Sequence, residues 1–245
     1  MIHKKLDDST LILTFDFGKG NSFSKKDMSE LLELLSDIEI DNNVKAIVLT
    51  GSNRSFSIGG NVEEIFSLKS SKEQEDFFRV MDLLLLKVFS IKKPIISAIN
   101  GHAIGLGFLL MLCSDLTVSI GNDKIKFGLP EITIGMTIDS LMIDILEFNN
   151  IKGKTLAKII YSGELLGCKT GQELGLIDFI VEENDLISNS LIQIDKLLKY
   201  GTQTHSLNKL NIRRKTIEAM EESFKGNSYS IFSKILSDNQ NIIQV

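Results

Sequence analysis

The chain has 245 residues, of which 43% are hydrophobic, and a formal net charge of −5. This composition provides a sizeable core, excludes a largely disordered chain and argues against nucleic acid as the main partner. The sequence has only two cysteines, so we expect neither disulfides nor a bound metal. It shows no signal peptide, and no apolar run approaches the roughly 20 residues that span a bilayer. We therefore expect a cytoplasmic protein without membrane contact.

The first half of the chain alternates predicted strands with predicted helices. Three short apolar segments rich in β-branched residues are predicted to be strands: 9–17, 44–51 and 94–99. Two segments with apolar residues spaced by three and four are predicted to be amphipathic helices: 24–40 and 72–91. Ser24 is the expected N-cap of the first helix, and Asn61 with Glu64 forms a capping-box pattern that should start another. This alternation predicts an α/β fold with a largely parallel sheet.

The second half has shorter predicted elements and then helices. The predicted strands are 116–120, 125–127 and 176–181. The predicted helical segments are 140–148, 151–161, a turn at 172–174, and most of 185–236 with breaks at Gly201 and Gly226. We expect a core at residues 1–195 and a C-terminal helical region at 196–245. That region is short for an independent core, so it should pack on the core or on a neighbouring subunit.

Residues 100–115 form the most informative stretch, because a predicted strand turns there through Gly101, Gly105 and Gly107 into an apolar helix. The first N–H groups of a helix lack intrahelical partners, and they can face an anion or a carbonyl oxygen that becomes one. Close strand–helix packing would explain these glycines equally well, and their spacing fits neither a dinucleotide fold nor a P-loop. A second loop, residues 56–61, also joins a strand to a helix. One N–H from each loop could therefore bind a single oxygen.

Several short sequence motifs resemble those of the enoyl-CoA hydratase/isomerase (crotonase) superfamily. They run in the same order from residue 9 to about 185: residues 54–60, 93–105, 113–116, 126–131 with Gly135, 161–163 and 173–177. The resemblance implies a crotonase-like ββα spiral core and an acyl-CoA or acyl-carrier thioester as ligand. Coenzyme A would then be part of the substrate, no separate cofactor is expected, and a homotrimer or hexamer is implied. The resemblance also implies that the backbone N–H groups of Ile58 and Gly105 form an oxyanion hole for an enolate.

Two acidic positions separate the reactions of this superfamily. Its hydratases hold water between two glutamates, one of which lies four residues after the oxyanion glycine, where this chain has Leu109. Leucine neither transfers a proton nor orients water, so Leu109 is expected only to contact the substrate. The second glutamate is matched by Glu131, and one glutamate alone is the pattern of Δ3,Δ2-enoyl-CoA isomerases and carboxymethylproline synthases. An apolar pocket should raise the pKa of Glu131, which suits a general base near neutral pH.

Asp139 has two open interpretations. It precedes a helical pattern and would cap that helix, whereas dienoyl-CoA isomerases carry an aspartate at about this place and an aryl-CoA dehalogenase uses one nearby as nucleophile. Ser57, Gly59 and Gly60 are expected to contact the substrate, as is Lys19, which falls near the family's CoA-contacting segment.

We therefore predict an acyl-CoA double-bond isomerase in which Glu131 moves a proton from C2 to C4, with Asp139 as a second candidate catalytic residue. The enolate could instead undergo C–C bond formation or decarboxylation. Hydration and a catalytically degenerate acyl-CoA-binding protein are further alternatives. The basic run at 209–215 is expected to be a solvated helix face or a contact to CoA phosphates.

Overall fold

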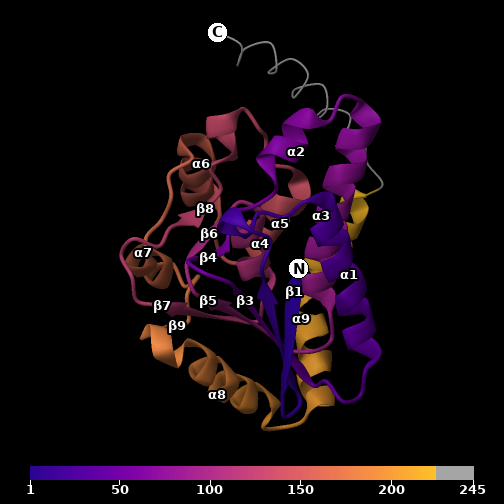
Figure 1. Cartoon of the computed structure of the whole chain (residues 1–245), viewed down its shortest axis with the longest axis vertical. Coiled ribbons are helices and arrows are strands. Elements are labelled where there is room, and N and C mark those ends of the chain that lie inside the picture. Colours follow the sequence, from indigo (N-terminus) through magenta and orange to yellow (C-terminus); the bar gives the residue numbers. More distant parts are fainter. Residues whose placement is uncertain (225–245) are drawn as a thin grey trace.

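A six-stranded sheet runs through the middle of the computed structural model, which describes residues 1–224 (Figure 1). Its strands lie in chain order: β1 (Ile2–Asp7), β2 (Thr10–Phe15), β3 (Ala46–Gly51), β5 (Ile95–Ile99), β7 (Leu116–Ile120) and β9 (Phe179–Val181). β1 is antiparallel to β2, and every other pair is parallel. The prediction of a largely parallel sheet is thus confirmed. β1 escaped prediction because its one buried residue, Ile2, gives no alternating pattern.

The helices pack around this sheet and around one another. They are α1 (Lys25–Ile40), α2 (Val62–Ser67), α3 (Ser71–Ser90), α4 (Leu106–Cys113), α5 (Ser140–Phe148), α6 (Gly153–Ser162), α7 (Cys168–Glu173), α8 (Leu186–Leu198) and α9 (Thr202–Ser223). Three 3-10 turns are η1 (Lys19–Asn21), η2 (Glu131–Ile134) and η3 (Glu183–Asp185). Every helix predicted within residues 1–224 is present, although α7 is longer than the predicted turn. The predicted break at Gly226 lies outside the described residues.

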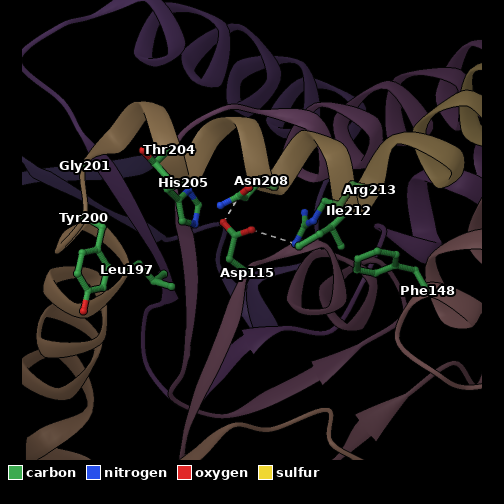
Figure 2. A pocket seen from close by; sticks show the side chains of 11 residues that line it. Asp115, Phe148, Leu197, Tyr200, Gly201, Thr204, His205, Asn208, Ile212 and Arg213 are labelled. Carbon is green, nitrogen blue, oxygen red and sulfur yellow. Dashed lines mark hydrogen bonds and ion pairs between the residues drawn. The ribbon is translucent and has the colours of Figure 1, made fainter.

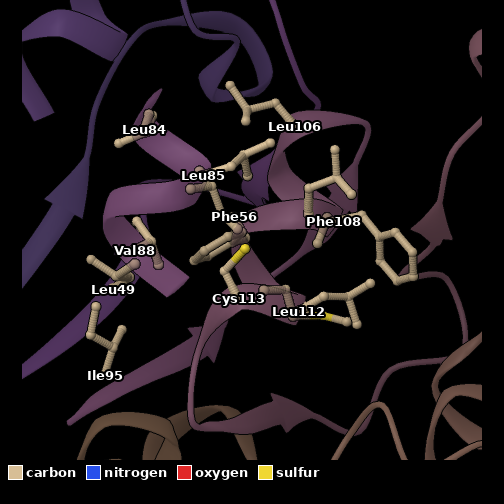
Figure 3. Packing of buried hydrophobic residues seen from close by; sticks show 14 of the residues in the cluster. Leu49, Phe56, Leu84, Leu85, Val88, Ile95, Leu106, Phe108, Leu112 and Cys113 are labelled. Carbon is tan, nitrogen blue, oxygen red and sulfur yellow. The ribbon is translucent and has the colours of Figure 1, made fainter. Parts of the chain in front are cut away.

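Both faces of the central strands are covered, which explains why their sequences are uninterrupted apolar runs. Every residue of β5 is buried, and so are the first five of β3. On one face, Val88 of α3 and Phe108 of α4 lie in a single cluster with Leu49 and Ile95 of these strands (Figure 3). On the other side of the strands, α8 contacts β3, β5 and β7 (Figure 1). The core therefore holds the sheet and α4 as one rigid support.

A second, small parallel sheet lies next to α4 (Figure 1). Its strands are β4 (Ser55–Ser57), β6 (His102–Ile104) and β8 (Phe127–Gly128). Each follows a strand of the larger sheet and precedes a helical element, which gives the units β3–β4–α2, β5–β6–α4 and β7–β8–η2. This arrangement confirms the ββα spiral that the resemblance implied. Of the three short strands, only the third overlaps a predicted one, because two or three residues carry no periodic pattern.

The predicted helix caps form with one difference. The Ser24 hydroxyl accepts the Asp27 N–H at 3.1 Å, and the Asp27 carboxylate accepts the Ser24 N–H at 3.0 Å. The Asn61 side chain likewise accepts the Glu64 N–H at 3.1 Å. The Glu64 carboxylate does not return to Asn61, because it accepts the N–H of Lys25 at 3.2 Å. It thereby joins α2 to the start of α1.

Two residues of the basic run at 209–215 are buried. These two belong neither to a solvated helix face nor to a free contact for phosphate. Lys209 and Arg213 of α9 are each 5% exposed, and both contact Asp115, at 2.8 and 3.0 Å. Figure 2 shows the contact between Asp115 and Arg213. They fix α9 to the core, where this helix packs against α3 and α5. The expected boundary near residue 195 lies within α8. Within residues 1–224, no helix is both long and apolar enough to cross a membrane.

Candidate active site

The two glycine loops touch each other at the end of the small sheet. Residues 58–61 lead from β4 to α2, and Gly105 joins β6 to α4. A Cβ atom on Gly59 would lie 3.2 Å from the Ile104 carbonyl oxygen and 3.4 Å from the Leu106 nitrogen. Gly59 and Gly105 also have positive φ values of 106° and 56°, which residues with a side chain rarely adopt. Only glycine allows the two backbones to approach so closely.

Beside this contact lies a cavity of about 180 Å³ with mainly apolar walls. Ile65 of α2, Met81 of α3, Leu109 of α4 and Met142 of α5 line it, and each is at most 5% exposed. Among the described residues of the lining, Glu131 is the single ionisable one. An apolar cavity with one carboxyl group and glycine loops at its edge has the composition of a small-molecule site.

The N–H groups of Ile58 and Gly105 are not free to bind a ligand, contrary to the expectation from sequence. The Ile58 N–H donates to the Gly20 carbonyl oxygen at 2.9 Å. The Gly105 N–H donates to the Gly128 carbonyl oxygen, also at 2.9 Å, and so extends the ladder between β6 and β8. Both groups hold the loops in place. The assignment of these two N–H groups as oxyanion donors is therefore wrong.

Two neighbouring N–H groups, those of Gly60 and Leu106, form no hydrogen bond within residues 1–224. Leu106 is the first residue of α4, so its N–H has no intrahelical acceptor. The residues on either side of Gly60 bond to the backbone of Phe23, which leaves the Gly60 N–H on the opposite side of the strand. Because Gly60 and Leu106 both line the cavity, two backbone donors are available there. The Leu106 donor could have been found from the sequence by assigning the free N–H to the first residue of the helix rather than to the glycine before it.

Glu131 stands at the start of η2, directly opposite the second loop. A Cβ atom on Gly105 would lie 3.0 Å from Oε1 of Glu131, so the carboxyl group abuts this loop. Oε2 is buried and has no hydrogen-bond partner within the described part of the chain. Burial in apolar surroundings raises the pKa of Glu131 to about 7. A carboxyl group with this pKa can accept a proton near neutral pH and release it again.

Comparison with known proteins identifies the family of this chain. The sequence pattern described as enoyl-CoA hydratase/isomerase matches residues 7–241. The chain belongs to this family. It is 29% identical to the carboxymethylproline synthase of Pectobacterium carotovorum subsp. carotovorum over 91% of this chain and 88% of that protein. It is also 29% identical to a probable enoyl-CoA hydratase of Bacillus subtilis, over 81% of this chain and 76% of that protein.

Solved structures of the enoyl-CoA hydratase/isomerase family share the fold. The human mitochondrial Δ3-Δ2-enoyl-CoA isomerase superposes with a TM-score of 0.84 and 21% identity, covering 99% of this chain and 98% of that one. The enoyl-CoA hydratase of Bacillus halodurans gives a TM-score of 0.85 at 21% identity, with 96% and 94% covered. Since the fold is equally close to an isomerase and a hydratase, the reaction has to be argued from the side chains in the cavity.

Leu109 lies on the cavity wall, one turn after the free N–H of Leu106. It is 1% exposed, so it faces the ligand space rather than solvent. This is the position at which the family resemblance places the first glutamate of the hydratases. A carboxylate that could hold water is therefore missing at this position, and Glu131 shares the cavity with an aliphatic side chain instead of a second glutamate.

Asp139 is the N-cap of α5 and does not line the cavity. Its Oδ1 accepts the Met142 N–H at 2.8 Å. Burial raises the pKa of Asp139, although the bonds from backbone N–H groups act in the opposite direction. Of the two open interpretations, the structure thus shows the helix cap directly. Asp139 is linked to the cavity through Met142, a lining residue whose backbone N–H it accepts.

Ser57 and Lys19 also lie outside the cavity lining. Ser57 is fully buried, and its hydroxyl accepts the Gly59 N–H at 3.1 Å, so it shapes the first loop. Lys19 is exposed on η1, next to Gly20, whose carbonyl oxygen receives the Ile58 N–H. The residues on either side of Lys19, together with Arg54, line a separate open groove of about 490 Å³. Arg54 therefore supplies a cationic side chain to this groove, and Lys19 lies in the chain between two of its lining residues.

Proposed function

We propose that this chain is an acyl-CoA double-bond isomerase that works through an enolate. The observation that carries this proposal is the single ionisable group in the described cavity lining, Glu131, beside two unpaired backbone donors. Moving a double bond along a thioester requires one group that takes a proton and returns it elsewhere. Hydration requires a second group to position water, and Leu109 supplies none.

The reaction is a proton shift with no net change in atoms. In a 3-enoyl thioester, the Glu131 carboxylate takes a proton from C2, and the electron pair moves into the carbonyl to form an enolate. The N–H groups of Gly60 and Leu106 donate to the enolate oxygen, a contact that in other enzymes is worth about 3–4 kcal/mol per donor. Protonated Glu131 then delivers the proton to C4, and the double bond moves from C3–C4 to C2–C3.

The carrier end of the thioester would occupy the open groove that Gly18, Gly20 and Arg54 line. Lys19 and Arg54 would contact the phosphate groups of the carrier, since a guanidinium or ammonium group forms strong bonds to phosphate oxygens. The same enolate could attack a carbon electrophile, as the named product of the carboxymethylproline synthase relative suggests. Proton exchange at C2 detects the enolate, which isomerisation and C–C bond formation share. The final product then distinguishes these two reactions.

Incubating the wild-type protein with a panel of acyl-CoA thioesters in deuterated water is the decisive test. We expect deuterium to replace the C2 protons of saturated thioesters and 3-enoyl thioesters to become 2-enoyl thioesters, both followed by NMR. Exchange without isomerisation would favour the C–C bond-forming alternative. Absence of exchange in every thioester would contradict enolate chemistry altogether.

Replacing Asp139 by Asn distinguishes a cap from a catalytic acid. Asparagine is as good an N-cap as aspartate, so we expect exchange rates within a few-fold of wild type and an unchanged fold. Asp139→Ala should lower the free energy of unfolding by about 1 kcal/mol through loss of the bond to Met142. A folded Asp139→Asn protein with a hundredfold slower exchange would instead assign chemistry to Asp139.

A further inference from the structure

We propose that the cavity limits the substrate to thioesters of short acyl groups, up to about six carbons, and that Met142 and Met81 set this limit. The inference rests on the proposed function, because it uses Glu131 and the two N–H donors to place the thioester carbonyl. It concerns the most deeply buried part of the cavity lining. There the lining consists of buried side chains from three helices.

This part of the lining belongs to the hydrophobic core, so its side chains cannot move aside without disturbing the core. Met81 of α3 and Met142 of α5 are 5% exposed, and Ile65 of α2 is 4% exposed. By contrast, Ile58 and Val62 on the same lining are each 39% exposed, so they mark its open side. The cavity therefore ends against the methionines rather than continuing to solvent.

The volume of the cavity fixes the size of the acyl group. An apolar protein cavity of about 150 Å³ accommodates benzene, which has six carbons. A cavity of about 180 Å³ therefore holds about six carbons in van der Waals contact. With the carbonyl group at the Gly60 and Leu106 donors, an acyl chain of this length reaches the methionine wall, and a longer one does not fit.

The position of Met142 is fixed by its backbone as well as by packing. Its N–H donates to the Asp139 carboxylate, which caps the first turn of α5. This bond prevents the turn from unwinding to open the cavity. The cap seen at Asp139 thus holds the wall that determines acyl length, which gives this buried aspartate a role without a part in proton transfer.

A second groove provides the main alternative route for a long chain. It has a volume of about 610 Å³, lies between η2, α5 and α6, and shares Met136 and Thr137 with the cavity. Its outer rim includes Tyr161, which is 76% exposed. A long acyl chain would have to pass Met136 and Thr137 to enter it, and the closed methionine wall leads us to favour the short-chain limit.

The test measures kcat/KM for 3-enoyl-CoA thioesters of four, six, eight and ten carbons. We expect a rise of about fourfold per added methylene up to six carbons, as each is buried, and a fall of about tenfold or more at eight. Met142→Ala removes three heavy atoms from the wall and should move the fall to ten carbons. Met142→Leu conserves the volume and should keep the wild-type limit. Met81→Ala deepens the same wall from α3, so it gives the result independently if Met142→Ala does not fold.

Each result supports or overturns the length limit. Equal turnover of six- and ten-carbon thioesters by the wild-type protein would overturn it, and loss of the ten-carbon activity in Met136→Trp would then identify the second groove as the route. An unchanged length profile in both alanine variants would also overturn it. C2 exchange of the four- and six-carbon thioesters tests the proposed function separately. Exchange at every length defeats the limit alone, whereas no exchange at any length defeats both proposals.

Discussion

Glu131→Gln is expected to slow C2 proton exchange and isomerisation by about 10²–10⁴-fold, the usual contribution of a general base. Glutamine has nearly the same shape as glutamate, but its amide accepts no proton at neutral pH. The donors at Gly60 and Leu106 belong to the backbone, so thioester binding should persist. Isothermal titration with a non-reacting acyl-CoA and NMR of exchange in deuterated water measure the two properties separately. Undiminished exchange in the variant would refute the assignment of Glu131.

The raised pKa of Glu131 gives this substitution a second, pH-dependent consequence. Only the ionised carboxylate acts as a base, so the wild-type rate should rise with pH through about 7 and then level off. The folded pKa lies above the ordinary value of 4.5, so the folded state holds the proton more tightly than the unfolded state. Stability should therefore decrease as pH rises from 4.5 to 7, by about 3 kcal/mol in total.

Glu131→Gln removes this loss, because glutamine does not ionise. The variant should be more stable than wild type at about pH 8 and nearly equal to it at about pH 4, as measured by urea unfolding at both values. Glu183→Gln is a matched control, since it removes an exposed carboxyl group and should change neither exchange nor stability. Equal stability of the Glu131 variant and wild type at the higher pH would show that the carboxyl group is solvated rather than buried.

The elements that could be predicted from sequence are those whose signal is local. The capped helix after Ser24 and the apolar strand at 95–99 each carry their pattern within one segment, and both lie where expected. The small sheet carries no such pattern. Its strands β4 and β6 have three residues each and exist because they pair with each other and with β8. Their presence depends on the packing of three distant chain segments.

The same cause explains the displaced oxyanion donors. Sequence analysis located both loops, but which N–H is free depends on which one donates to another segment of the backbone. Gly105 pairs with Gly128, and Ile58 pairs with Gly20, 38 positions earlier in the chain. Neither partner is evident from the glycine pattern itself. The free donors are consequently Leu106, one residue later, and Gly60, two residues later.

Arg213→Met is expected to destabilise the protein by about 3–5 kcal/mol, a large loss for a single substitution. The guanidinium group of Arg213 donates to the carbonyl oxygens of Phe89, Cys113 and Ser114 at 2.8, 2.7 and 2.9 Å. It also contacts the Asp115 carboxylate at 3.0 Å (Figure 2) and stacks 4.4 Å from the Phe89 ring. Methionine fills much of the space but leaves these buried acceptors without donors.

Those carbonyl groups lie at the C-terminal ends of α3 and α4, where a cation also interacts favourably with the helix dipoles. Arg213 therefore joins α9 to the helix whose first residue, Leu106, supplies an oxyanion donor. For a chain of this size we expect the melting temperature to fall by about 6–20 °C. Arg214→Met is the matched control, because it removes the same charge from the next, exposed position and should change the melting temperature by less than about 4 °C. Similar melting temperatures for the two variants would mean that Arg213 does not hold α9 on the core, and that the end of α4 needs no buried guanidinium group.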